Sequence, residues 1–94
     1  MATLEESAAR LTTGPGVYLF RDRAGDVLYV GKAKNLRARV KQYLSGHDER
    51  MMVPHMVASA GDIDVVLVET EKEALILENS LIKQHNPPYN VRLR

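Results

Sequence analysis

Residues 16–31 read Gly-Val-Tyr-Leu-Phe-Arg-Asp-Arg-Ala-Gly-Asp-Val-Leu-Tyr-Val-Gly. The first six, and residues 27–30, are rich in β-branched and aromatic side chains, which is typical of strands. Residues 22–26 lie between the two runs and consist largely of turn formers. The stretch therefore predicts a β-hairpin with strands over 16–21 and 27–30, and Gly31 is expected to end the second strand.

Helices are predicted on both sides of this hairpin. Residues 3–11 favour a short amphipathic helix, and residues 35–44 carry a helical period. Four apolar residues share one side of the second of these helices: Leu36, Val40, Tyr43 and Leu44. Both helices are therefore expected to pack an apolar face against the sheet.

The second half of the chain predicts a helix, a strand and a long helix. Residues 49–60 favour a helix that either begins near Pro54 or is kinked there, because proline lacks the N–H that a helix interior needs. Residues 63–68 read as a third strand. A long helix should run to His85, and residues 89–94 are expected to form an extended tail. The order β-β-α-α-β-α predicts an α+β fold, in which helices flank a small three-stranded antiparallel sheet.

Composition narrows the class of protein. A chain of 94 residues suits a single domain. It has no cysteine, which excludes disulfides, cysteine-based zinc fingers and a thiol nucleophile. No apolar run approaches the ~20 residues of a membrane helix. The N-terminal acids do not resemble a signal peptide. We therefore expect a cytoplasmic protein without a membrane segment.

Charge is unevenly distributed although the net charge is only +1. Residues 27–47 contain no acid. Five basic residues lie in that stretch: Lys32, Lys34, Arg37, Arg39 and Lys41. Such a cluster suits a phosphate-backbone ligand, and it is equally compatible with a solvated helix face.

The long helix carries an acid where its period predicts core. Thr70 and Glu73 form a capping-box pattern that marks its start. Glu78 shares a side with four apolar residues: Ala74, Leu75, Leu81 and Ile82. An unpaired carboxylate costs several kcal/mol to bury, so it needs a partner. Two partners remain open: a structural ion pair with Arg39, whose side chain lies at the rim of its own helix's apolar stripe, or a divalent metal ion.

Two tyrosines lie in neighbouring predicted strands. Tyr18 and Tyr29 can approach each other across an antiparallel pair, and each alone is most simply explained by packing. Close to Lys32 and Arg39, however, a phenol would have a lowered pKa and would be a better proton acceptor.

These residues resemble a known family. Gly16-Val17-Tyr18 and Tyr29-Val30-Gly31 resemble the two halves of the signature that names the GIY-YIG nucleases, with valine in place of isoleucine. Residues 29–40, 73–83 and 86–93 resemble the UvrC-type branch of that family. The resemblance covers nearly all of the chain from Gly14 onward.

The resemblance implies a metal-dependent endonuclease that hydrolyses a DNA phosphodiester. Its metal-binding glutamate falls on Glu78, which would hold one Mg²⁺ or Mn²⁺, and its arginine falls on Arg39. Its catalytic tyrosines and lysine fall on Tyr18, Tyr29 and Lys32. Five further positions are expected to support DNA or the site: Tyr43, Asn90, Gly31, Lys34 and Arg37.

The resemblance also implies a mechanism and partners. Tyr29 is the preferred general base and Tyr18 would orient it or the attacking water, although a metal-bound hydroxide is an alternative nucleophile. In this family the module begins a longer protein, so residues 1–94 are expected to be a single-domain N-terminal fragment, monomeric by itself. The expected partners are damaged DNA and, through regions beyond residue 94, UvrB. The expected role is 3′ incision in bacterial nucleotide excision repair. Another UvrC-like nuclease, or a non-catalytic DNA-binding module, stays open.

Overall fold

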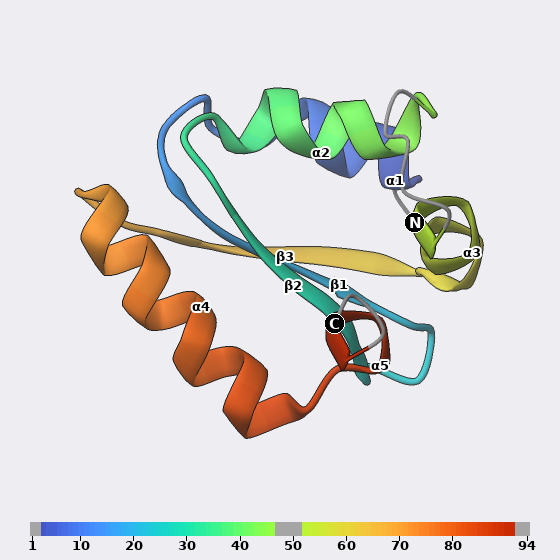
Figure 1. Ribbon diagram of the computed structural model, residues 1–94. Helices are drawn as coiled ribbons and strands as arrows, with labels where there is room; N and C mark the ends of the chain where they lie inside the picture. Colours follow the sequence, from blue (N-terminus) through green and yellow to red (C-terminus); the bar gives the residue numbers. More distant parts are fainter. Residues whose placement is uncertain (1–2, 47–51, 92–94) are drawn as a thin grey trace.

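The computed structural model describes residues 3–46 and 52–91. They form three strands and five helices in these two ranges, shown in Figure 1. The elements are α1 (Leu4–Ala9), β1 (Gly16–Arg21), β2 (Val27–Ala33), α2 (Leu36–Leu44), α3 (Met52–Ser59), β3 (Asp62–Leu67), α4 (Glu71–His85) and α5 (Pro88–Val91).

The sheet is antiparallel, with strand order β2-β1-β3. β1 lies in the centre and pairs with β2 through the predicted hairpin. In this register Tyr18 lies opposite Gly31, and Phe20 lies opposite Tyr29. The predicted α+β class and three-stranded antiparallel sheet are confirmed. β2 and β3 are the two edge strands, so the outward backbone groups of β2 are open to side chains from elsewhere.

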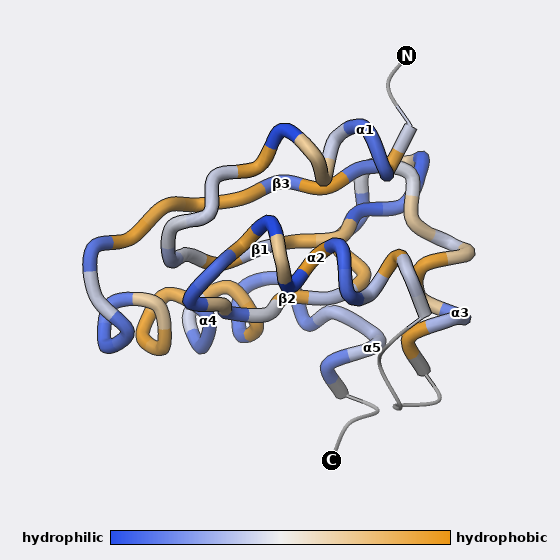
Figure 2. The backbone as a smooth tube through the Cα atoms, turned by 90° about the horizontal axis from the view of Figure 1, so that it is seen from above, coloured by the Kyte–Doolittle hydropathy of each residue, from blue (hydrophilic) through white to orange (hydrophobic). Residues whose placement is uncertain are grey.

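Helices cover both faces of the sheet, with α2 on one side and α4 on the other (Figure 1). The first face packs against α1, α2 and α3 through a cluster that includes Tyr18, Phe20 and Tyr43. The second face packs against α4, where Val17, Val30 and Ala74 form a smaller cluster with other apolar residues. Figure 2 shows hydrophobic residues along the strands, whereas α4 alternates between hydrophobic and hydrophilic turns. Such a mixture of apolar and polar residues fits a helix that packs its apolar side on the sheet and exposes its polar side.

Side-chain caps set where the helices begin. Asn35 caps α2 by accepting a hydrogen bond from the Ala38 N–H, at 3.0 Å. Thr70 caps α4 by accepting one from the Glu73 N–H, at 3.1 Å. In the predicted capping box Glu73 should reach the Thr70 backbone, but it instead accepts a bond from the Thr70 hydroxyl at 3.3 Å. Both helices therefore begin where the sequence predicted.

Pro54 lies in the first turn of α3, where its missing N–H costs no helical hydrogen bond. Of the two alternatives for residues 49–60, the helix that begins near Pro54 is the correct one, and residues 49–51 lie outside the described ranges. α4 ends at His85 as expected. Asn86 follows in the left-handed conformation (φ 46°), and its N–H bonds the Ile82 carbonyl at 2.8 Å. Asparagine tolerates this conformation better than most residues.

Three local predictions are wrong. Gly31 does not end the second strand, because β2 continues through it to Ala33. The tail from Tyr89 is not extended where it is described, because Pro88 supplies a preset first helical residue for α5. Leu75 is 46% exposed and is not core. α4 sets Ala74, Leu77 and Leu81 on the sheet, and Leu75 lies about 100° around the helix from Ala74.

No helix in the described part of the chain is long and apolar enough to cross a membrane.

Candidate active site

Four aromatic rings gather on the α2 face of the sheet. Tyr18 lies 5.5 Å from Tyr43 and 6.3 Å from Tyr29, measured between ring centroids. Phe20 stacks on Tyr43 at 5.7 Å. All four are 5% exposed or less. The two signature tyrosines are therefore brought together, as predicted, inside a packed aromatic cluster.

The signature glycines allow this packing. Tyr18 lies across the strand from Gly31, and its phenol ring and hydroxyl occupy the space that a Cβ at Gly31 would need. At Gly16 a Cβ would meet the Val66 carbonyl and the Leu36 side chain. Each glycine is thus required by a close approach from a neighbour, and Gly31 acts by placing Tyr18.

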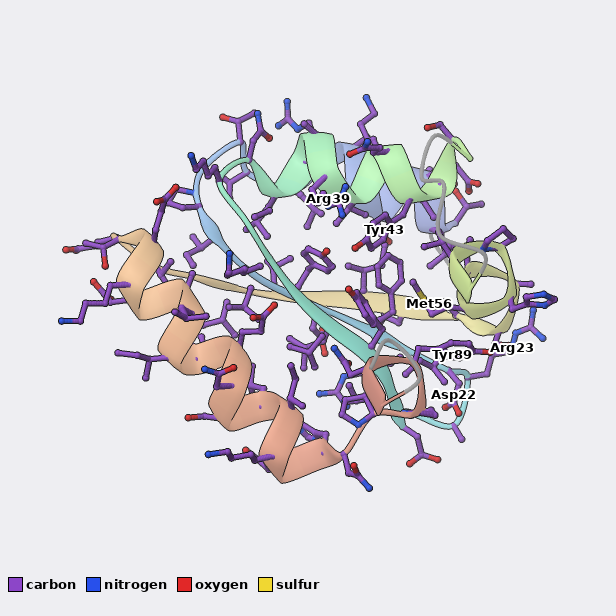
Figure 3. All side chains as sticks on the ribbon, in the orientation of Figure 1. Asp22, Arg23, Arg39, Tyr43, Met56 and Tyr89 are labelled. Carbon is purple, nitrogen blue, oxygen red and sulfur yellow. The ribbon has the colours of Figure 1, made fainter. Side chains whose placement is uncertain are left out.

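A hydrogen-bonded chain links Tyr18 to Arg39. The Tyr18 and Tyr43 hydroxyls lie 2.6 Å apart, and Arg39 Nη2 donates to the Tyr43 hydroxyl at 3.3 Å. The guanidinium also lies 4.7 Å from the Tyr43 ring centroid, within cation–π range. Its Nη1 donates to Gln42 Oε1 at 2.8 Å. Figure 3 shows Arg39 and Tyr43 extending from α2 toward the sheet. The cluster therefore holds Arg39 in a defined orientation.

Burial determines the protonation of Tyr18. Loss of solvent raises the pKa of its phenol well above the ordinary value, and Tyr43 raises it further by charge repulsion and hydrogen bonding. The smaller effect of Arg39 lowers it. Tyr18 thus stays protonated at neutral pH and is suited to hold Tyr43 rather than to accept a proton.

Side chains from the C-terminal helices occupy the outer edge of β2. Asn90 bonds both backbone groups of Val30: the Val30 N–H donates to Oδ1 and Nδ2 donates to the Val30 carbonyl, each at 2.8 Å. Two residues further along, the Lys32 N–H donates to the carboxylate of Glu78. Because alternate residues of an edge strand direct their backbone groups outward, Asn90 and Glu78 lie in succession along the edge.

Glu78 is half-buried on the α4 side of this edge. Burial raises the pKa of its carboxyl, while the charge of Lys32 and the Lys32 N–H bond lower it by less. The interactions with Lys32 offset only part of the cost of removing this carboxylate from water, so a cation is favoured as a further partner. No group of three or more His, Cys, Asp or Glu side chains gathers within residues 3–46 and 52–91. The donor set is one half-buried carboxylate, and Mg²⁺ is commonly held by one or two carboxylates with waters in its other positions.

The alternative ion pair between Arg39 and Glu78 is not supported. Arg39 bonds Gln42 and Tyr43 from α2, and Glu78 lies on α4 at the opposite face of the sheet. The cation that acts on Glu78 is Lys32.

The other predicted basic residues divide into two kinds. Lys32, Lys34 and Lys41 are exposed. Arg37 is partly buried, and its Nε donates to the Leu11 carbonyl at 2.7 Å. Arg37 therefore does not lie on a fully solvated helix face, because this bond ties the segment before β1 to α2.

The predicted site residues thus surround one strand. Tyr29, Gly31 and Lys32 belong to β2, while Asn90 and Glu78 bond its outer edge. Tyr18, Arg39 and Tyr43 lie on the α2 face, whereas Glu78 reaches the open edge of the strand from α4. Tyr29 and Lys32 are three residues apart, about 10 Å along a strand.

The sequence did not point to Gln42 or Tyr89. Gln42 lies three residues after Arg39, a helical spacing that could have indicated their contact. Tyr89 comes from α5 and packs against the core cluster to which the aromatic rings belong (Figure 3). Its contact depends on how α4 turns into α5, so no sequence period indicates it.

Comparison with known proteins identifies relatives. Residues 14–91 match the family described as UvrC-like GIY-YIG domains. The chain is 60% identical over 80 residues to the UvrABC system protein C of Syntrophus aciditrophicus, covering 85% of this chain and 13% of that protein. It is 59% identical over 83 residues to the same protein of Protochlamydia amoebophila, covering 87% and 14%. The chain therefore spans about one seventh of these relatives.

Solved structures are similar across almost the whole chain. The GIY-YIG N-terminal endonuclease domain of UvrC from Thermotoga maritima, in a form bound to magnesium, superposes with a TM-score of 0.82. It is 34% identical, and the match covers 92% of this chain and 93% of that one. A point mutant of that domain, with phenylalanine in place of a tyrosine, matches with the same score at 32% identity and 92% coverage of both chains, and is bound to the divalent cation.

Proposed function

Because this chain belongs to the family of UvrC-like GIY-YIG domains, we propose that it is a divalent-metal-dependent endonuclease that hydrolyses a DNA phosphodiester. The observation that carries the proposal is the half-buried Glu78 carboxylate, held by the Lys32 N–H at the edge of the strand that also carries Tyr29. A similar domain from Thermotoga maritima binds magnesium as its catalytic cation.

Glu78 is the proposed ligand of one Mg²⁺ or Mn²⁺, with waters in the other positions. Such an ion, when bound, supplies positive charge at the scissile phosphate and acidifies water. The Lys32 N–H fixes the orientation of the carboxylate. Support also comes from the Thermotoga domain, in which single replacements of a tyrosine or an asparagine leave the cation bound. In that domain, therefore, the cation still binds when either of those side chains is replaced.

Arg39 is proposed to bind the phosphoryl oxygens as negative charge develops on them. A guanidinium offers a planar set of donors that matches phosphate oxygens. Gln42 and Tyr43 hold it in place before DNA arrives, and such preorganisation is the main source of electrostatic stabilisation in active sites. Tyr18 and Gly31 are positioning residues that act through Tyr43.

Tyr29 is the proposed proton acceptor for the attacking water. It lies on the strand that also carries Lys32, and it packs beside Tyr18. Asn90 holds the strand on the outside of Val30, the residue next to Tyr29. The chain thereby fixes the position of Tyr29 from both its packed face and its outer edge.

DNA contact is proposed to rest on the exposed lysines Lys34 and Lys41, with the remaining N–H groups of Arg37. This small basic surface predicts weak binding without sequence preference, in the range of roughly 10⁻⁴ to 10⁻⁶ M.

The wider role is a proposal that rests on the relatives' names. We propose that the chain is a single domain, a monomer by itself and the N-terminal part of a longer cytoplasmic protein of bacterial nucleotide excision repair. That protein would make the 3′ incision in damaged DNA and bind UvrB through segments beyond this chain.

Calorimetric titration of Mn²⁺ into wild type and Glu78→Ala tests the metal site, with thermal melts of both and Glu73→Ala as a control acid from the same helix. We expect binding in wild type and Glu73→Ala and none in a folded Glu78→Ala. If neither wild type nor variant binds, the titration is repeated with a short duplex present. Absence of binding there, too, would reject the metal-dependent nuclease and favour a non-catalytic DNA-binding module.

A further inference from the structure

A cavity of about 270 Å³ lies between the end of β2 and the start of α4. Two lysines contribute to it, and one of its helical residues, Ala74, lies one turn before Glu78. Its lining consists of Pro15, Lys32, Ala33, Lys34, Glu71 and Ala74. The cavity is therefore a positively charged recess next to the proposed metal ligand, with one acid at its rim.

That acid is paired with one of the lysines. Lys34 Nζ lies 3.0 Å from Glu71 Oε1, and the two side chains are 85% and 67% exposed. Ion pairs this exposed contribute little, because water and salt screen them. The pair can therefore open when another anion reaches Lys34.

We propose that this recess is a subsite for a second backbone phosphate of the DNA strand being cut, and that Glu71 occupies Lys34 until the phosphate displaces it. The inference rests on the proposed function. Glu71 and Glu78 are seven residues apart on one helix, about 10 Å along its axis. Phosphates of one strand are separated by their rotation around the duplex as well as by a rise of about 3.4 Å per nucleotide, so the recess receives a phosphate about one or two nucleotides from the scissile one.

The two lysines of the subsite, Lys32 and Lys34, differ in position and in freedom to move. Lys32 is tied to Glu78 by its backbone N–H and lies between the metal ligand and the recess. Lys34 lies at the rim, where its long side chain can turn from Glu71 to a phosphate. A backbone phosphodiester carries one negative charge, as the carboxylate does, but it belongs to a polyanion whose condensed counterions are released when Lys34 binds it. Glu71 then acts as an internal competitor that weakens DNA binding.

If Glu71 competes with a DNA phosphate for Lys34, removing the Glu71 charge should strengthen DNA binding only when Lys34 is present. Affinity for a short fluorescein-labelled duplex is measured by anisotropy at low salt in EDTA, for wild type, Glu71→Gln, Lys34→Gln and the double variant. Glu71→Gln should bind about threefold more tightly than wild type. Lys34→Gln should bind more weakly, and Glu71→Gln should have no further effect in that background.

Glu73→Gln is the matched control, because Glu73 is an exposed acid in the same first turn of α4. It changes net charge equally but is not paired with Lys34. An equal gain from Glu73→Gln, or a gain from Glu71→Gln that persists without Lys34, would overturn the proposal. Because EDTA removes the metal, this result is independent of cleavage. Loss of Mn²⁺ binding would reject the nuclease without changing the coupling between Glu71 and Lys34.

Discussion

The two faces of the sheet differ in how far their polar side chains are satisfied by hydrogen bonds within the protein. On the α2 face, the Tyr18 and Tyr43 hydroxyls bond each other inside an aromatic cluster, and Arg39 completes the chain. On the α4 face, Glu78 interrupts an apolar stripe and accepts a hydrogen bond from a single backbone N–H. The first face is internally satisfied and suited to hold geometry, whereas the second leaves a carboxylate suited to bind a cation.

The sharpest test of this difference replaces one polar group on each side. Tyr29→Phe and Glu78→Gln each change few atoms. Tyr29→Phe should lower incision by about 10²- to 10⁴-fold, as loss of a general base does, whereas Glu78→Gln should abolish metal-dependent incision. Only Glu78→Gln should also abolish Mn²⁺ binding. Incision is measured in the reconstituted repair reaction and binding by calorimetry. If Tyr29→Phe also lost the ion, the two faces would not be separate in function.

The next test introduces one methyl group into the aromatic face. Gly31→Ala should lower the free energy of unfolding by about 3 kcal/mol, because its Cβ would overlap the Tyr18 ring and hydroxyl. Urea denaturation measures the change. Gly14→Ala is the control, since a Cβ there meets only Thr12 Oγ1 at an ordinary 3.5 Å. Equal stability of the two variants would contradict the close packing of Tyr18 on β2.

Asn90 tests whether the outer edge of β2 needs its side-chain partner. Asn90→Ala removes two hydrogen bonds from Val30 and should destabilise the protein by about 2 kcal/mol. The Val30 amide should exchange with solvent faster than in wild type, as measured by NMR. Asn79→Ala, at an exposed position of α4, should leave that rate unchanged.

The smallest effect concerns pH. The folded-state pKa of Tyr18 is raised, so its contribution to stability is present below the unfolded pKa and is lost as pH rises beyond it. Wild type should therefore lose stability above about pH 10, where the unfolded tyrosine ionises. Tyr18→Phe should cost about 1 kcal/mol at neutral pH and should flatten the alkaline decline. An equally steep decline in Tyr18→Phe would show that other groups cause it.

The sequence by itself determined the main elements and their order. The hairpin from Gly16, the cap at Thr70 and the end of α4 at His85 follow from short-range preferences that act within a few residues. Glu78 was recognisable as an anomaly for the same reason, because a helical period places it among apolar neighbours. The resemblance then named residues that the structure brings around β2.

Only the tertiary structure decided what each of these residues touches. The extension of β2 through Gly31 depends on pairing with β1, and the exposure of Leu75 depends on which side of α4 meets the sheet. The rejection of Arg39 as the ion-pair partner of Glu78 required the two helices to be placed on their faces. Such contacts join residues far apart in the chain, and their energies depend on distance and burial, which local sequence preferences do not specify.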